Sequence, residues 1–217
     1  MRKESIYIEE IKRLYSNIRD EINNRLKEFK KKWEESEEVI FAELVFCILT
    51  PQSKAKLCWK TVETLRKKNL LLNGERNEIA KELNMVRFKN KKTSYIISAR
   101  NQFLNNGKIS IKSIIKKFRN PMDAREWLIK NVKGIGYKEA SHFLRNIGFG
   151  ENFAILDRHI LKNLKSLGVI NSIPKNLSRK KYIQVEEKMK KLSEKMNIPL
   201  SLLDLLLWYK ETGEIFK

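Results

Sequence analysis

The sequence is poor in residue types that mark particular classes of protein. Only two cysteines are present, Cys47 and Cys58, which are too few for a four-cysteine zinc site or an iron–sulfur cluster. Because each lies within an apolar helical pattern, we expect two buried thiols and neither a metal nor a cofactor. Proline is equally scarce, with 4 in 217 residues, and each stands in a loop or where a helix could begin. No low-complexity linker or internal repeat is visible.

Long hydrophobic runs are also missing. The most apolar early stretch, VIFAELVFCIL at residues 39–49, is too short to cross a bilayer and is interrupted by Glu43. The N-terminal sequence MRKESIYIEEIKR mixes acids with bases and has no apolar core, so it does not resemble a secretory signal. We therefore expect an intracellular protein that has no membrane partner.

Acidic residues are few relative to basic ones. The chain has 46 Lys and Arg against 26 Asp and Glu, a formal net charge of +20, which favours a polyanionic partner and nucleic acid first. Hydrophobic residues make up 41%, enough for a core in one compact unit or in two small lobes. Basic clusters containing aromatic residues are interpreted as solvated faces, some of which line the path of the nucleic acid: residues 27–33, 87–92 and 114–120.

Apolar residues recur at helical spacing almost throughout, which predicts an all-α fold. Asn120 can cap a helix that begins near Pro121. Two lobes would form if the middle helices made one bundle and the N-terminal and C-terminal helices another. The predicted helices are residues 5–30, 37–49, 54–67, 77–83, 93–105, 111–118, 122–131, 137–147, 157–167, 178–196 and 200–210.

The segment VKGIGYKEASHFL, within residues 122–147, predicts a helix-hairpin-helix motif. Gly134 and Gly136 permit a tight turn and expose backbone N–H groups at the start of the second helix, where they can bind a phosphate. The alternative is a plain αα-hairpin with a glycine C-cap. The large positive charge favours phosphate binding.

A lysine and an aspartate stand out beside this motif. Lys138 lies in the first turn of the second helix, where the helix dipole and Lys133 disfavour an ammonium ion and favour a nucleophilic amine. Alternatively, Lys138 is a surface lysine that touches a phosphate. Asp157 follows nineteen residues later among apolar neighbours, an unusual setting unless it caps a helix, performs chemistry, or does both.

The pattern VKGIGYKEA followed by LDRHI resembles the helix-hairpin-helix DNA glycosylases of the endonuclease III superfamily. The segment ILTPQSKA, the C-terminal LLLWYKETGEIFK and the lack of a cysteine cluster resemble, within it, the compact archaeal-type 8-oxoguanine DNA glycosylase/AP lyases. The likeness covers residues 39–217. It implies a single glycosylase unit over residues 1–217, built of two helical lobes with a cleft for DNA and the base between them.

The resemblance also implies an activity. Lys138 would be the nucleophile and Schiff-base residue, and Asp157 would assist it in excising 8-oxoguanine and cleaving the strand by β-elimination. The expected partner is double-stranded DNA containing 8-oxoguanine, bound by a monomer without an iron–sulfur cluster. Two alternatives remain: a glycosylase/lyase for another oxidised base, and a DNA-binding module without catalysis.

Three further polar side chains are candidates for DNA contact. Gln52 follows Thr50 and Pro51, which form either a turn or the start of a helix, and the resemblance implies that Gln52 fills the gap left by the extruded base. His142 lies one helical turn after Lys138, where it contacts the base or simply packs. His159 resembles a phosphate-contacting histidine of the family, and a histidine on a helix surface is the alternative.

The C-terminal segment supplies the remaining candidates. The resemblance implies that the carboxylate of Lys217 reaches the base, that Trp208 stacks on it, and that Phe216 is a neighbour. The alternative is a core helix followed by a tail that only packs. Asp204 interrupts an apolar run and either pairs with a basic group or helps to form the base pocket.

Overall fold

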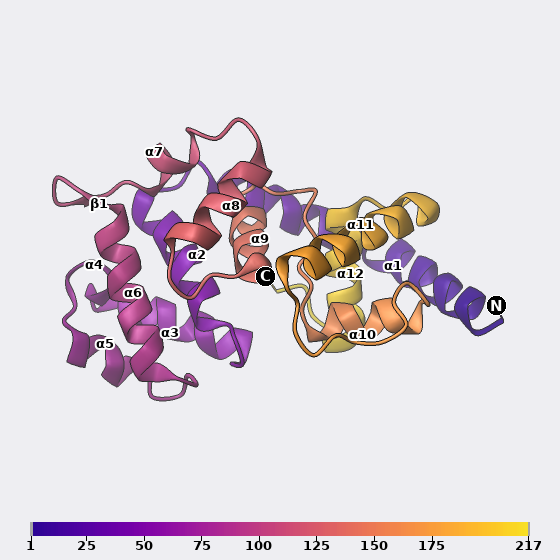
Figure 1. Ribbon diagram of the computed structural model, residues 1–217, viewed down its shortest axis with the longest axis horizontal. Coiled ribbons are helices and arrows are strands. Elements are labelled where there is room, and N and C mark those ends of the chain that lie inside the picture. Colours follow the sequence, from indigo (N-terminus) through magenta and orange to yellow (C-terminus); the bar gives the residue numbers. More distant parts are fainter. Residues whose placement is uncertain (1, 217) are drawn as a thin grey trace. The chain divides into compact units, whose positions relative to one another are not determined.

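The computed structural model describes residues 2–216, which fall into two compact units. One unit combines the chain up to Lys31 with the chain from Gly148 on, and the other comprises Lys32–Ile147. Figure 1 labels the elements along the chain. The helices of the described residues are α1 (Arg2–Lys32), α2 (Glu37–Leu49), α3 (Ala55–Lys67), α4 (Leu70–Asn73), α5 (Arg76–Glu82), α6 (Lys89–Phe103), α7 (Ile111–Ile115), α8 (Pro121–Asn131), α9 (Tyr137–Asn146), α10 (Arg158–Ser166), α11 (Arg179–Met196) and α12 (Leu200–Thr212).

Side-chain caps mark where several helices begin. The Ser36 hydroxyl accepts a hydrogen bond from the Val39 N–H at the start of α2. The Asn120 side chain accepts one from the Met122 N–H, and Pro121 occupies the first turn of α8, which confirms the predicted start of this helix. These local signals explain why the predicted starts of α2 and α8 lie within one residue of the observed ones.

In the unit formed by Lys32–Ile147, α2 is the central helix and packs against α3, α6, α7 and α9 (Figure 1). Residues Ile40–Leu49 are all buried, as expected for a helix that is apolar on every side. Glu43 is the charged exception. Its carboxylate lies 2.9 Å from the Lys32 ammonium and accepts a hydrogen bond from the Asn146 amide at 3.1 Å. The buried charge is thus paired and hydrogen-bonded.

In the other unit, α10 and α11 both pack against α12. Residues Leu200–Leu207 of α12 are buried. A segment outside the helices and strands, residues 153–156, is also buried and leads directly into α10. This segment carries the chain from the core to the candidate Asp157.

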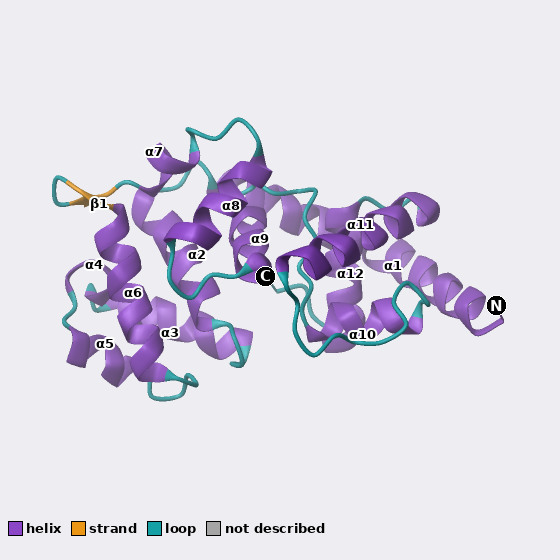
Figure 2. Cartoon of the chain, viewed as in Figure 1, coloured by secondary structure: helices purple, strands orange, loops and turns teal. Residues whose placement is uncertain are grey.

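The all-α prediction is confirmed, with one small strand element within residues 2–216. Strands β1 (Leu104–Asn105) and β2 (Lys108–Ile109) pair antiparallel and close a tight hairpin (Figure 2). The short α4 was not predicted, and α6 begins at Lys89 rather than at residue 93. Both cysteine side chains are buried, as predicted. No helix among the described residues is long and apolar enough to cross a membrane.

Candidate functional site

Helices α8 and α9 pack on each other and form the predicted helix-hairpin-helix motif. Gly134 turns the chain between them with φ +87°. A Cβ at this position would lie 2.4 Å from a ring carbon of Tyr95, which belongs to α6. The position therefore needs glycine both for its backbone conformation and for the close approach of an aromatic ring.

Gly136 precedes the first residue of α9 and has extended φ and ψ of −105° and −170°. Its N–H donates to the Glu139 carboxylate at 3.2 Å, while the Ile135 N–H donates to the Val132 carbonyl at 3.3 Å. Two N–H groups of the hairpin thus have partners within the protein. A phosphate that bound this turn would have to compete with the Glu139 carboxylate for the Gly136 N–H.

A buried arginine braces the hairpin from inside. Arg125 of α8 is 1% exposed, and its Nη1 donates to the Ser141 hydroxyl of α9 at 3.2 Å. Its guanidinium lies over the Tyr137 ring, 5.4 Å from the ring centre. These contacts fix the orientation of α9 relative to α8 and therefore of the residues in the first turn of α9.

Lys138 lies in that first turn and is half-buried. Its amine is 3.4 Å from the hydroxyl of Thr50, just after the C-terminal end of α2. The Thr50 hydroxyl in turn donates to the Cys47 carbonyl at 3.0 Å, which leaves its lone pairs to accept from the amine. Two segments that are 88 residues apart in the sequence thus meet at the candidate nucleophile.

Gln52 belongs to the same turn as Thr50. The Ser53 N–H donates to the Thr50 carbonyl at 3.0 Å, and Gln52 is exposed with φ +55°. The alternative in which Thr50 and Pro51 begin a helix is wrong, because α3 begins only at Ala55 and Lys54 precedes it. The turn thus presents the Gln52 side chain to solvent.

His142 is 5% exposed, one turn along α9 from Lys138. Its ring contacts that of Phe46 in α2 edge-on, with 5.5 Å between the centres. The structure therefore places His142 in the contact between α2 and α9. Contact with a base remains a prediction.

Asp157 caps α10, as predicted, because its carboxylate accepts the Ile160 N–H at 2.9 Å. The segment before it is held by side chains of α11 and α12. The Ile155 N–H donates to the Asp204 carboxylate at 2.9 Å, and the Ala154 N–H donates to the Glu186 carboxylate at 3.0 Å. Asp204 therefore supports the backbone that leads to Asp157, and a direct contact of Asp204 with the base remains a prediction.

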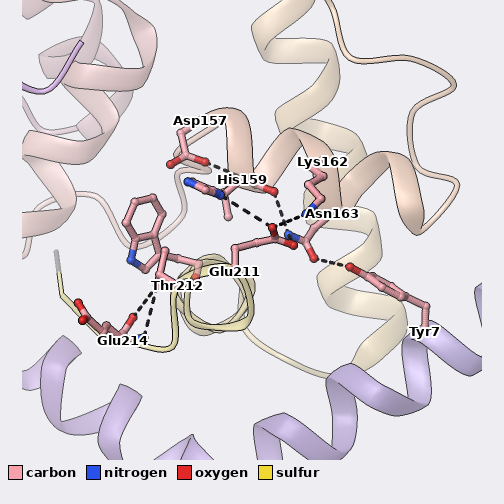
Figure 3. A network of polar contacts seen from close by, with 10 residues as sticks. Tyr7, Asp157, His159, Lys162, Asn163, Glu211, Thr212 and Glu214 are labelled. Carbon is pink, nitrogen blue, oxygen red and sulfur yellow. Dashed lines mark hydrogen bonds and ion pairs between the residues drawn. The ribbon is translucent and has the colours of Figure 1, made fainter. Parts of the chain in front are cut away.

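Figure 3 shows the polar network beside Asp157. Glu211 of α12 accepts hydrogen bonds from Lys162 at 2.6 Å and from the Asn163 amide at 3.2 Å, both on α10. The hydrogen bond from Lys162 holds the pKa of Glu211 below its ordinary value. The network reaches α1 through the Tyr7 hydroxyl, which donates to Asn163 at 2.7 Å.

His159 and Trp208 lie next to each other at the edge of this network. The His159 ring meets the Trp208 ring edge-on with 5.1 Å between centres, and its Nδ1 is 3.9 Å from a Glu211 oxygen. The indole N–H of Trp208 is buried and has no acceptor among the described residues. An unpaired buried donor costs about 1–3 kcal/mol, and such costs often mark functional positions.

After α12 the chain turns sharply at Gly213, where φ is +72°. Thr212 stabilises the turn, because the Glu214 N–H donates to its hydroxyl at 3.4 Å. The Ile215 carbonyl accepts from Arg25 of α1 at 3.3 Å. Phe216 is half-buried, and Lys217 lies outside the described residues.

No group of three or more His, Cys, Asp or Glu side chains in residues 2–216 is arranged to hold a metal ion. The chemistry supported by the described residues is that of an amine beside a helix N-terminus and of a carboxylate fixed by a helix cap. Such groups suit nucleophilic catalysis through a Schiff base and stabilisation of positive charge.

The family model described as 8-oxoguanine DNA glycosylase matches residues 22–198. The chain belongs to the 8-oxoguanine DNA glycosylase family. An 8-oxoguanine DNA glycosylase/AP lyase of Fusobacterium nucleatum is 49% identical over 99% of this chain and 100% of the relative. Another of Methanocaldococcus jannaschii is 43% identical over 97% of each chain. A crystal structure of a Methanocaldococcus jannaschii 8-oxoguanine glycosylase/lyase with a 15-mer DNA containing 8-oxoguanine has a TM-score of 0.88 and 40% identity, covering 98% of this chain and 100% of that one.

One exposed segment overlaps the basic cluster at residues 87–92, one of the clusters that the sequence predicts to be solvated faces, some of them along the DNA path. Met85 is 74% exposed and Phe88 is 54% exposed, and Phe88 has φ +59°. The N–H of Arg87 donates to the Ser53 hydroxyl at 3.2 Å, so the segment adjoins the turn that carries Gln52. The signal that could have found it is the presence of large apolar residues within a basic run.

Proposed function

We propose that the chain excises 8-oxoguanine from duplex DNA and cleaves the strand at the resulting abasic site. The observation that carries this proposal is the likeness, over 98% of the chain, to a Methanocaldococcus jannaschii enzyme in complex with DNA containing 8-oxoguanine. The net charge of +20 supports a DNA partner, because Lys and Arg neutralise phosphates. The proposed acting form is a monomer.

Lys138 is the proposed nucleophile. Its amine attacks the deoxyribose C1′ and forms a bond to it. The glycosidic bond breaks at the same carbon, and the electron pair of that bond leaves with the base. Loss of a proton from the nitrogen and opening of the sugar ring give an imine between Lys138 and C1′. The imine then draws electrons from C2′ as a C2′ proton is removed, and the 3′ phosphate departs. The hydrogen bond to Thr50 supports this role because it holds the amine in place.

Asp157 is the proposed partner in catalysis. Its carboxylate stabilises positive charge that develops on the sugar and helps to move the lysine proton. The cap on α10 supports this role, since one carboxylate oxygen accepts the Ile160 N–H and the carboxylate is thereby fixed in one orientation. Asp204 contributes indirectly by holding the preceding backbone at Ile155.

The bound DNA requires contacts of three kinds. The base must leave the stack, which costs a few kcal/mol, and the exposed Gln52 side chain fills the gap because its amide can both donate and accept. Trp208 stacks on the extruded base, and its buried N–H without an acceptor in the described chain supports a role in recognition. Backbone phosphates bind at the Gly134–Gly136 turn and at His159.

Single-turnover assays with Lys138→Gln test the proposal. On a duplex with 8-oxoguanine opposite cytosine, base release and strand cleavage should each fall by about 1000-fold, because glutamine cannot form the imine. DNA binding should persist, since glutamine is only one atom shorter than lysine and its amide can still donate hydrogen bonds. If the wild-type protein cleaves a duplex with an abasic site but does not release 8-oxoguanine, the base that it excises is a different one. Binding with no cleavage of either duplex would mean a DNA-binding module.

A further inference from the structure

The turn at residues 50–53 adopts a conformation that its sequence disfavours. Gln52 has φ +55°, in the left-handed region that glycine and asparagine occupy more readily. A non-glycine residue there costs about 1–2 kcal/mol. Such a conformation persists only when surrounding contacts determine it, and it often occurs at functional sites.

The contacts that determine this turn come largely from one buried lysine. Lys92 of α6 is 4% exposed. Its ammonium donates to the carbonyls of Leu49 and Pro51, each at 2.7 Å, and to the Ser53 hydroxyl at 3.1 Å. An ammonium has three donors, so each N–H has an acceptor in or next to the turn. Two of the acceptors lie on either side of Gln52.

The surroundings of Lys92 show that its charge is costly. Burial lowers the pKa of Lys92 and raises that of the neighbouring Cys58 thiol to about 11. The Cys58 thiol donates to the Leu49 carbonyl at 3.2 Å, the same carbonyl that accepts from Lys92. Fold stability alone does not explain a buried ammonium, because an apolar side chain of similar size often serves a core equally well or better.

We propose that Lys92 is a positioning residue that holds the Pro51–Ser53 turn in the left-handed conformation and so presents Gln52 to the gap in the duplex. The inference rests on the proposed function. Lys92 touches no substrate and acts through the backbone on both sides of Gln52. A turn released from Lys92 relaxes toward negative φ at Gln52, and the glutamine amide then points away from the position that it must fill.

The test is a double-mutant cycle that combines Lys92→Met with Gln52→Gly. On a duplex with 8-oxoguanine opposite cytosine, Lys92→Met should slow single-turnover base release by about tenfold. In the Gln52→Gly background it should slow release by less than about twofold, because glycine has no side chain to position. A merely structural role predicts the same loss in both backgrounds.

A second readout uses a single-stranded oligonucleotide with a preformed abasic site. No duplex gap exists in this substrate, so the loss of rate caused by Lys92→Met should be smaller on it than on the duplex. A matched control is Glu43→Gln, which removes a different buried charge from the same unit and should leave the ratio of the two rates unchanged. An equal loss on both substrates with Lys92→Met would overturn the inference.

Ser53→Ala provides a milder variant if Lys92→Met does not fold. It removes one acceptor of Lys92 and should give a loss of about threefold on the duplex, again only when Gln52 is present. Additive losses for Ser53→Ala and Gln52→Gly would overturn the inference. If the wild-type chain does not release 8-oxoguanine in the same assay, the proposed function fails and the inference fails with it. If the wild-type chain is active and the losses of the single variants add in the double variant, the inference is rejected and the proposed function stands.

Discussion

Gly134 shows how one residue without a side chain determines the hairpin. Its φ of +87° is costly for any other residue, and Tyr95 occupies the space where a Cβ would be. The turn therefore lets the Tyr95 ring pack directly on the backbone between α8 and α9. Because Lys138 lies shortly after this turn, a distortion at Gly134 is expected to move the candidate nucleophile.

We expect Gly134→Ala to destabilise the protein by about 2–4 kcal/mol, from backbone strain together with the overlap with Tyr95. Unfolding in urea, followed by circular dichroism, measures this loss. Gly107→Ala is the matched control, since Gly107 also has positive φ, at +76°, but has open space around its Cβ position. Its cost should be limited to about 1–2 kcal/mol of strain. Equal costs at the two positions would show that Tyr95 does not constrain the turn.

At single residues, the sequence predicts roles that depend on near neighbours. The cap by Asp157 was predicted because the carboxylate and the helix it caps are adjacent in the chain. The hydrogen bond by which Asp204 supports this segment was not predicted, because Asp204 and Ile155 are 49 positions apart. The contact between Lys138 and Thr50 was missed for the same reason.

Helices α1, α10 and α12 are joined by the polar network around Glu211. The Glu211 side chain is 11% exposed and lies 2.6 Å from Lys162. On the other side of the network, the Lys210 ammonium lies over the Tyr7 ring, 4.5 Å from its centre. These contacts hold α12, which carries Trp208, against the helix that Asp157 caps.

Because of this network, the free energy of unfolding should depend on pH in the acid range. Because the pKa of Glu211 is held below its ordinary 4.5, the stabilisation is complete above pH 4.5 and is lost as pH falls through the lowered value. We expect Glu211→Gln to lower the free energy of unfolding by about 1–2 kcal/mol at pH 7, and by progressively less as the pH falls through the lowered pKa of Glu211. Urea unfolding at a series of pH values measures this. Glu10→Gln, at a 54% exposed side chain, should change little throughout the series. A Glu211 effect that does not depend on pH would exclude the charge as its cause.

Secondary-structure elements were predicted well where caps and apolar periodicity agree. The bounds of α2 match the predicted residues 37–49, and those of α8 differ by one residue. The short hairpin of β1 and β2 was missed, because two residues per strand are too few to show alternation. The early start of α6 was missed because Phe88 before it has a left-handed conformation that no local signal indicates.

For the whole molecule, composition and fold lead to the same partner. A net charge of +20 predicts binding to a polyanion, and the family to which the chain belongs acts on DNA by its description. Neither property identifies the residue that performs the chemistry. We therefore predict that Lys138, among many lysines, forms the covalent bond to DNA.

Borohydride trapping identifies the lysine that forms this bond. The chain is incubated with a duplex containing 8-oxoguanine opposite cytosine, reduced, and digested with a protease, and the modified peptide is sequenced by mass spectrometry. We predict a single adduct on Lys138 that is absent from Lys138→Gln, because reduction fixes the imine to the nitrogen that formed it. An adduct on another lysine, or strand cleavage without any adduct, would exclude Lys138 as the Schiff-base residue.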